Sequence, residues 1–392
     1  MKTIYILLLL LLIVGFSSAQ TIEVGTDSLS YYESNYQYLK AINFINKVYS
    51  KNIPPDIANR KAILLEKVGK NKEAGNIYSE IYGEDSLSIA NGINLALSLT
   101  KQKQYIEAQN LYEKLYRIDS SNFYLNSNLA LLYHKNKKTY KAIKIYIKNH
   151  ELDSTDITTT INIAKLFLQK EHSGSSAHWA SKGLALEPNN VELLYIMSKA
   201  KYMQKDYPKA TLYLDNLLSL GDTAKKYIIL KGKLSFEQAK YNSEKYIDVI
   251  RWFSKVADPM NETEVIHYYL GISYHELGEE KKSIKHLSRA IELGISSYVP
   301  IYLEKIAYSY ISEKNYQKAI NTWEKLNLLS PNIKYDYYIA NITYTYLNDK
   351  KLAISRYETV MRKDKSKATK YYADSYIKIQ QLKKKLHLEG KL

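Results

Sequence analysis

Three asparagines at a constant spacing form the most regular chemical pattern in this sequence. Asn94, Asn128 and Asn162 are equally spaced, and we call their separation the repeat interval. A side-chain amide offers two hydrogen-bond donors and an acceptor, a set that suits the backbone of an extended polypeptide. The alternative is that each amide makes a structural hydrogen bond inside its own part of the fold.

A basic and an aromatic residue accompany these amides. Lys165 and Lys199 are also one repeat interval apart, and Tyr195 lies between them in the sequence. Aromatic side chains are enriched at protein interfaces. We therefore interpret the six residues together as a candidate surface for binding a partner.

The sequence lacks the motifs that mark common enzymes. It contains no GxSxG, HExxH or GxGxxG and no phosphate-cradling glycine loop. The absence of Cys excludes disulfides, Cys-ligated zinc and thiol catalysis. His267 and His275 could share a helix face, but no carboxylate cluster accompanies them. We expect no enzyme activity, no cofactor and no metal site.

A small residue that recurs at the repeat interval defines a structural repeat. Such a fixed period is typical of a solenoid, in which each unit packs only on its neighbours. The unit around Ala108 has helical periodicity on both sides of a polar turn at 101–104. The recurring positions are Ala74, Ala108, Ala142, Ser176 and Ala210, followed later by Ala319 and Ala353.

Each unit combines small and aromatic residues in one phase. The first helix has a small residue, and the second has a small residue followed four positions later by an aromatic ring. The first-helix positions are Ala62, Ala96, Ala130, Ala164, Ser198, Gly271, Ala307 and Asn341; the second-helix aromatics are Tyr78, Tyr112, Tyr146, Trp323 and Tyr357.

This series resembles the tetratricopeptide repeat, a 34-residue helix-turn-helix unit. The resemblance covers residues 55 to 365 approximately and implies an all-α, right-handed solenoid. It also implies that the first helices line a concave groove, in which the asparagines would contact the backbone of a bound peptide. The family's clamp for a terminal carboxylate needs Lys and Asn where this sequence has Ile93 and Leu97. We therefore expect no such clamp.

The N-terminus has the pattern of a secretory signal peptide. Lys2 precedes the apolar stretch 4–16, and Ser17, Ser18 and Ala19 supply small residues for cleavage. The apolar stretch is shorter than the ~20 residues that span a bilayer. We expect an exported protein that is periplasmic, associated with the outer membrane or secreted.

The repeats divide the remaining chain into segments. An insertion in the irregular segment either forms a loop on the binding face or only shifts the stacking, and both readings stay open. The expected segments are 1–19 signal peptide, 20–54 lead-in and capping helix, 55–220 repeats, 221–263 irregular repeat, 264–367 repeats and 368–392 basic capping helix.

Net charge and tyrosine content leave alternatives open. The formal charge is +16, and Lys383 to Lys385 could contact an anionic surface or simply keep the terminal helix soluble. The 39 Tyr exceed what the repeat core needs, so a carbohydrate-binding envelope factor that uses Tyr195 or Trp252 is the alternative function. Our first expectation is a scaffold that binds a peptide or helix of a partner protein, with no nucleic-acid role.

Overall fold

The computed structural model describes residues 28–50, 52–257, 263–294 and 297–390. The regular structure in these ranges is helical and contains no strand. No helix within them is both long and apolar enough to cross a bilayer. The expected signal peptide, 1–19, lies outside the described residues.

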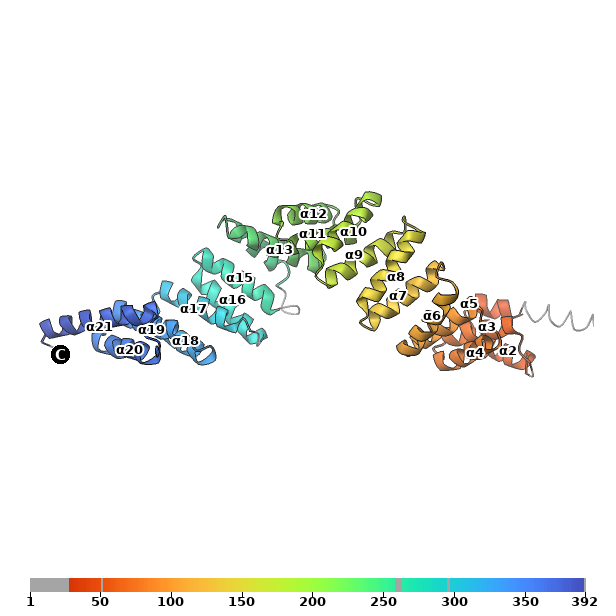
Figure 1. The fold of residues 1–392 in the computed structure, drawn as a ribbon, viewed down its shortest axis with the longest axis horizontal. Helices are drawn as coiled ribbons and strands as arrows, with labels where there is room; N and C mark the ends of the chain where they lie inside the picture. The colour runs from red at the N-terminus through yellow and green to blue at the C-terminus, as the bar shows by residue number, and fades with distance from the viewer. Residues whose placement is uncertain (1–27, 51, 258–262, 295–296, 391–392) are drawn as a thin grey trace, which may run out of the picture. The chain divides into compact units, whose positions relative to one another are not determined.

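The chain divides into two compact units, with the boundary between Pro188 and Asn189. Within each unit, successive helices pair and each second helix packs on the next first helix in chain order (Figure 1). Unit 1 contains α2 (Tyr38–Val48), α3 (Pro55–Lys67), α4 (Asn71–Glu84), α5 (Ile89–Lys101), α6 (Tyr105–Ile118), α7 (Phe123–Lys135), α8 (Thr139–Leu152), α9 (Ile157–Gln169) and α10 (Ser173–Leu186).

Unit 2 continues the same arrangement of pairs. Its helices are α11 (Val191–Met203), α12 (Tyr207–Ser219), α13 (Lys225–Ala239), α14 (Lys245–Ser254), α15 (Glu264–Glu276), α16 (Glu280–Leu293), α17 (Val299–Ser312), α18 (Tyr316–Leu329), α19 (Ile333–Thr345), α20 (Lys350–Lys363) and α21 (Lys370–Leu388).

Side-chain caps fix the start of the first helices. Ser88, Asn122, Asp156 and Asn190 follow one another at the repeat interval, and each accepts a hydrogen bond from the backbone N–H three residues later. These bonds satisfy donors that a helix N-terminus leaves without intrahelical partners. The repeat period is therefore also a period of helix starts.

Left-handed backbone at one residue ends each first helix in the regular region. Gly69 has φ 81°, and Lys103 and Lys137 have φ 65° and 60° at successive repeat intervals. Glu171 and Lys205 continue the series with φ 61° each. Glycine adopts this conformation without steric cost, whereas other L-residues do not. The turn geometry is thus kept even where the sequence has no glycine.

Small residues at the helix crossings are fully buried, as the phased series predicts. Ala96 of α5 and Ala108 of α6 are both 0% exposed. The last pair differs, because the predicted Asn341 of α19 is half-buried, whereas its neighbour Ala340 is 0% exposed. Asn341 instead accepts a hydrogen bond from the Tyr357 hydroxyl over 2.6 Å. Asn341 thus keeps the repeat interval, but this pair has a half-buried polar side chain where the others have a small residue.

The irregular repeat differs from its neighbours in the lengths of its helices. Its first helix stays in register, since Gly232 follows Ser198 by the repeat interval and a Cβ there would lie 2.6 Å from the Phe253 ring. Its first helix α13 has 15 residues against 13 in α11, and the turn 240–244 that follows is longer than a regular turn such as 102–104. Tyr241 in this turn is 88% exposed. The range 221–263 for the irregular repeat stays a prediction.

Two of the three consecutive lysines of the terminal helix α21 contact other side chains of the protein. Lys383 pairs with Glu358 at 3.3 Å. The Lys385 ammonium donates to the Tyr344 hydroxyl at 3.1 Å, which lowers the pKa of Tyr344. Contact of these lysines with an anionic surface stays a prediction.

Candidate partner-binding surface

The six predicted site residues all lie on first helices. We call the surface formed by α3, α5, α7 and α9 the first-helix face of unit 1. The surface formed by α11, α13, α15, α17 and α19 is the first-helix face of unit 2. Unit 1 holds Asn94, Asn128, Asn162 and Lys165, and unit 2 holds Tyr195 and Lys199.

The three asparagines are half-buried but differ in their hydrogen bonds. The Asn94 amide donates to Asn59 Oδ1 of the neighbouring first helix at 3.3 Å. The Asn128 amide donates to the carbonyl of Tyr124 in its own helix at 2.8 Å. The Asn162 side chain makes no hydrogen bond within the described part of the chain. Two asparagines thus already use a donor structurally, while the amide of Asn162 keeps its full bonding capacity.

An apolar row accompanies the asparagines in unit 1. Ile63 and Leu131 are 42% and 54% exposed, and Leu97 between them is half-buried. These three residues lie at successive repeat intervals, and Lys165 follows Leu131 by the same interval on α9. Exposed apolar side chains in line are available for burial against a partner. Leu97 stands where the family's carboxylate clamp needs Asn. This position therefore offers apolar contact in place of a hydrogen bond.

Tyr195 is part of an aromatic and basic cluster in unit 2. Its ring meets the Tyr227 ring edge-on at 5.1 Å between centroids. The Lys226 ammonium lies 5.0 Å from the Tyr195 centroid and 4.8 Å from that of Tyr227. Burial raises the pKa of Tyr195. Tyr227 is buried, so the surface of the cluster consists of the half-buried Tyr195 ring and the exposed Lys226.

The sequence analysis missed Lys233, which follows Lys199 by the repeat interval. Lys233 is half-buried on α13, while Lys199 on α11 is exposed. Burial lowers the pKa of Lys233, and the charge of Lys199 lowers it further. The constant spacing was the available signal, but the sequence analysis ended the regular register at Leu220, before α13.

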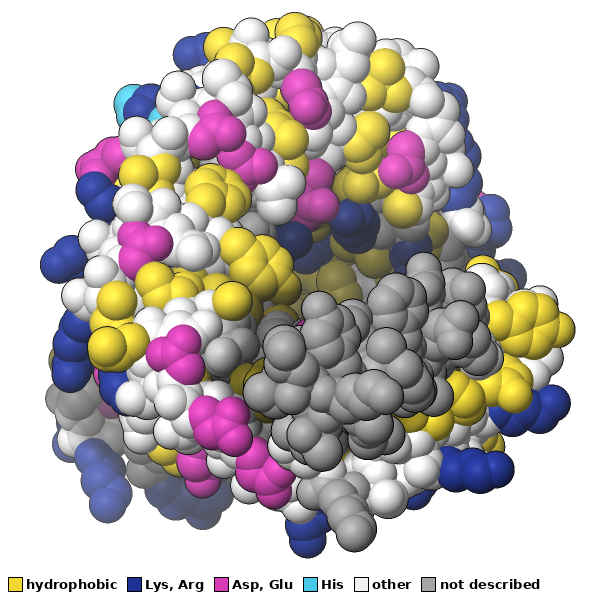
Figure 2. Space-filling model, turned by 90° about the vertical axis from the view of Figure 1, so that its right-hand side faces the viewer, with side chains coloured by type: hydrophobic (Ala, Val, Ile, Leu, Met, Phe, Trp, Pro, Cys, Tyr) yellow, Lys and Arg dark blue, Asp and Glu magenta, His cyan; other side chains and the backbone are white. Residues whose placement is uncertain are grey.

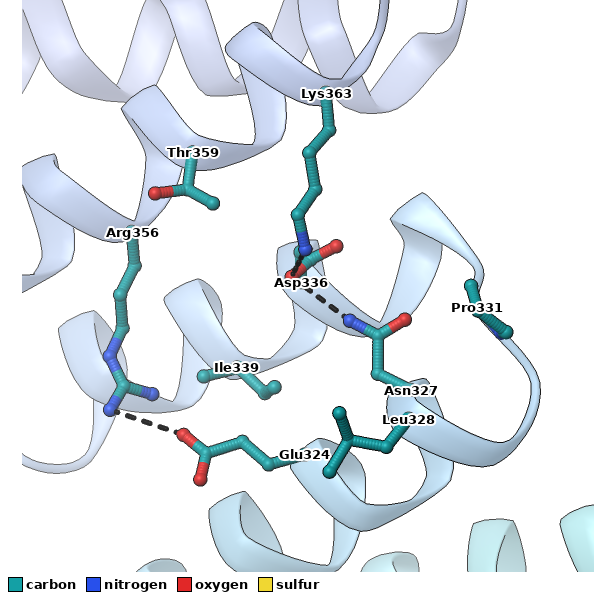
Figure 3. Close-up of a pocket in the computed structure, with 9 residues that line it drawn as sticks. All are labelled: Glu324, Asn327, Leu328, Pro331, Asp336, Ile339, Arg356, Thr359 and Lys363. Carbon is teal, nitrogen blue, oxygen red and sulfur yellow. Dashed lines mark hydrogen bonds and ion pairs between the residues drawn. The ribbon is translucent and has the colours of Figure 1, made fainter.

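Two cavities border second helices, whereas the six predicted site residues lie on first helices. One of roughly 550 Å³ is lined by residues of α18, α19 and α20 (Figure 3). Inside it Lys363 pairs with Asp336 at 2.8 Å, and Asn327 donates to the same carboxylate at 3.0 Å. Arg356 faces Glu324 at 3.7 Å. These charges compensate one another, so we interpret this cavity as a groove between packed repeats.

The irregular repeat borders a cavity of about 570 Å³ lined in part by Trp252, Lys225 and Ile228. The Lys255 ammonium lies 4.1 Å from the Trp252 ring centroid. Trp252 is half-buried. A ring in this position could contact a sugar, but Lys255 already covers one part of it.

The histidines singled out by their spacing have separate partners. The Nδ1 atoms of His267 and His286 lie 2.8 Å apart, with the rings stacked. His275 Nδ1 instead contacts Glu280 at 2.9 Å and Ser309 at 3.0 Å. No cluster of three or more His, Cys, Asp or Glu with metal-binding geometry occurs among the residues that the structure describes.

The positive excess does not form a continuous field on the face drawn in Figure 2. Hydrophobic and acidic side chains are interspersed there with Lys and Arg. Affinity for nucleic acid depends chiefly on clustered positive charge. This face therefore offers no such electrostatic footprint.

The fold is an all-α solenoid of tetratricopeptide type. It consists of helix pairs in one phase, with small residues at the crossings and N-caps at the repeat interval. No family model and no curated protein matches the chain. Solved structures that it resembles include a tetratricopeptide repeat protein from Parabacteroides merdae, at a TM-score of 0.47 and 16% identity, covering 65% of this chain and 98% of that one.

The chain also aligns with two further solved structures. The chain aligns with YrrB, described as a protein of this repeat class with an unusual peptide-binding site, at a TM-score of 0.38 and 17% identity, covering 46% of this chain and 91% of that one. It aligns with yeast Tom70 at 0.37 and 14%, covering 93% and 96%. These scores and identities are too low to support a shared function.

Proposed function

We propose that this chain is a protein-binding scaffold whose first-helix faces bind a partner polypeptide. The observation that supports it best is the combination of the apolar row with the Asn162 amide, which lacks a protein partner in the described part of unit 1. A bound segment could bury apolar side chains against Leu97 and Leu131 and hydrogen-bond its backbone to Asn162. Surface complementarity, with no chemical step, is the whole mechanism.

We also propose that the scaffold works outside the cytoplasm, with a role in envelope assembly or secretion. The support is the signal-peptide pattern at 1–19. N-terminal sequencing of the protein recovered from its host should find Gln20 first. A mature chain that begins at Met1 would contradict export by this route.

Site-specific crosslinking tests the binding surface. A photoreactive amino acid would replace Leu131 of the first-helix face in full-length protein, and a matched one would replace exposed Lys144 on the second helix α8. Crosslinking in the intact host, followed by mass spectrometry, should give one or two protein adducts from position 131 and none from 144. Equal labelling from both positions would contradict the proposed surface.

Substitution of the amides tests the polar part of the surface. Asn128→Ala with Asn162→Ala should weaken the captured partner's binding while thermal unfolding stays unchanged. Unchanged affinity would show that the asparagines have only structural roles.

A carbohydrate-binding function is the second candidate, supported by the cavity beside Trp252. Isothermal titration with envelope polysaccharide would separate the two functions. Binding that is lost in Trp252→Ala, without a protein adduct at position 131, would favour the carbohydrate reading.

A further inference from the structure

We propose that Lys199 and Lys233 form an anion-binding subsite on the first-helix face of unit 2, which takes two acidic side chains from a partner polypeptide. The inference rests on the proposed function, because it names the chemistry of the segment that is bound. It concerns two cations that the packing of the repeats does not require.

Buried backbone neighbours fix the positions of both lysines. Lys199 follows Ser198, which is 0% exposed, on α11. Lys233 precedes Leu234, which is 1% exposed, on α13. The two helices contact each other directly. Only the lysine stems are therefore free to adjust, while their points of attachment are held by the core.

The two ammonium groups disfavour each other in the unbound protein. Burial lowers the pKa of Lys233, and the positive charge of Lys199 lowers it further. A neighbouring anion would offset both the loss of water and the repulsion between like charges. Perturbed groups of this kind are enriched at functional sites.

Two carboxylates on α12 and α13 are engaged with other lysines. Glu237 pairs with Lys240 at 2.6 Å. Asp215 pairs with Lys231 across α12 and α13. Within the described ranges, Lys199 and Lys233 form no ion pair or hydrogen bond. In this proposal the partner supplies the complementary charge.

The surroundings favour a polypeptide as the source of that charge. Tyr195 lies one helical turn before Lys199 on the same face, and its ring packs on Tyr227. Contacting helix axes are typically ~8–10 Å apart, and an extended chain covers that span in about three residues. A segment with acidic residues two or three positions apart could thus reach both lysines and contact the half-buried Tyr195 ring.

Binding of an oligoglutamate peptide tests the subsite. Full-length protein would be titrated into fluorescein-labelled oligoglutamate, with oligoglutamine as the uncharged probe, and followed by anisotropy. Lys199→Met with Lys233→Met should weaken oligoglutamate binding at least about tenfold, because two charge-assisted contacts are lost. The matched control is Lys281→Met with Lys285→Met, which removes the same charge from exposed positions of α16 and should weaken binding less than about twofold.

A charge reversal gives an independent readout. Lys199→Glu with Lys233→Glu should lose oligoglutamate and gain affinity for oligolysine. Absence of oligoglutamate binding to the unmodified protein, or an equal loss in the α16 control, would overturn the subsite. A partner that crosslinks at position 131 and binds the Lys199→Met, Lys233→Met protein with unchanged affinity would overturn it as well, while leaving the scaffold function intact.

Discussion

Ser198 donates a hydrogen bond from its hydroxyl to the carbonyl oxygen of Ala210 over 2.7 Å, where α11 crosses α12. Both residues are 0% exposed. In the pair α9 and α10 the direction is reversed, because Ser176 of the second helix donates to the carbonyl of Ala164 over 2.9 Å. Serine at a small position thus keeps the close approach that alanine allows and adds a fixed polar contact.

Removing this contact should destabilise unit 2. Ser198→Ala loses one buried hydrogen bond without a steric clash, so the free energy of unfolding should fall by about 1 kcal/mol. Urea unfolding followed by circular dichroism would measure the change. The control is Ser219→Ala, which removes a similar bond to a backbone carbonyl at an exposed position and should have a much smaller effect. Equal effects would mean that burial does not strengthen the Ser198 bond.

Replacing a left-handed lysine by glycine should stabilise the protein. Lys137 has φ 60° and is exposed at the turn between α7 and α8. Glycine removes the steric cost of this conformation but adds freedom to the unfolded chain, so the expected net gain from Lys137→Gly is about 0.5–1 kcal/mol. Thermal unfolding would report it as a higher Tm. Gly69→Ala, at φ 81°, should shift Tm in the opposite direction.

The stability of unit 1 should fall in mild acid because of His150. Burial lowers the pKa of this histidine, the nearby charge of Lys182 lowers it further, and Asp153, Asp156 and Glu151 oppose the shift. As pH falls, the histidine of the unfolded chain therefore binds a proton before that of the folded protein. The stability present at neutral pH is lost as pH falls below the pKa of His in the unfolded chain, about 6.5. Thermal unfolding between neutral pH and mild acid would measure this slope.

A pair of substitutions isolates the histidine responsible. His150→Gln should flatten the decline of Tm with acid, since it removes the proton-binding ring that packs on Trp179 at 4.8 Å. His178→Gln, at an exposed position of α10, should leave the decline in place. A decline of unchanged slope in the His150 variant would assign the effect to other groups.

A side chain at Gly232 should disrupt the irregular repeat. A Cβ at this position would lie 2.6 Å from the Phe253 ring, and that ring stacks on Tyr269 at 4.9 Å. Gly232→Val should therefore cost about 1–3 kcal/mol through overpacking, seen as a lower Tm. Gly174→Ala is the control, because nothing lies within 4 Å of a Cβ there. Partial rescue of Gly232→Val by Phe253→Leu would confirm the clash as the cause.

The fold was largely predictable because its signals are local and repeated. Small residues such as Ala96 and Ala108 mark the crossings, and the structure buries both completely. Asn341 is the exception, because its side chain accepts a hydrogen bond from Tyr357, and a fixed interval cannot show such a contact. The repeat interval also continued to Gly232, but the lengthened turn after Ala239 concealed it.

The candidate surface was less predictable than the fold. Spacing identified the asparagines but could not show that Asn94 and Asn128 use a donor on the protein itself. The spacing from Lys199 also reaches Lys233, but only the structure shows that Lys233 is half-buried and that Glu237 pairs with Lys240. Hydrogen bonds and burial depend on which side chains contact one another. A repeat pattern specifies only the backbone position of each residue.

The capping residues Ser88, Asn122, Asp156 and Asn190 make the regular region modular as well as stable. A segment that runs from one cap to the next contains one whole helix pair with its own turn. Excising or duplicating such a segment would leave every remaining first helix of this region with its cap and every crossing with its small residue. The chain could therefore change its length in whole steps, and recombination at these four positions would join compatible ends.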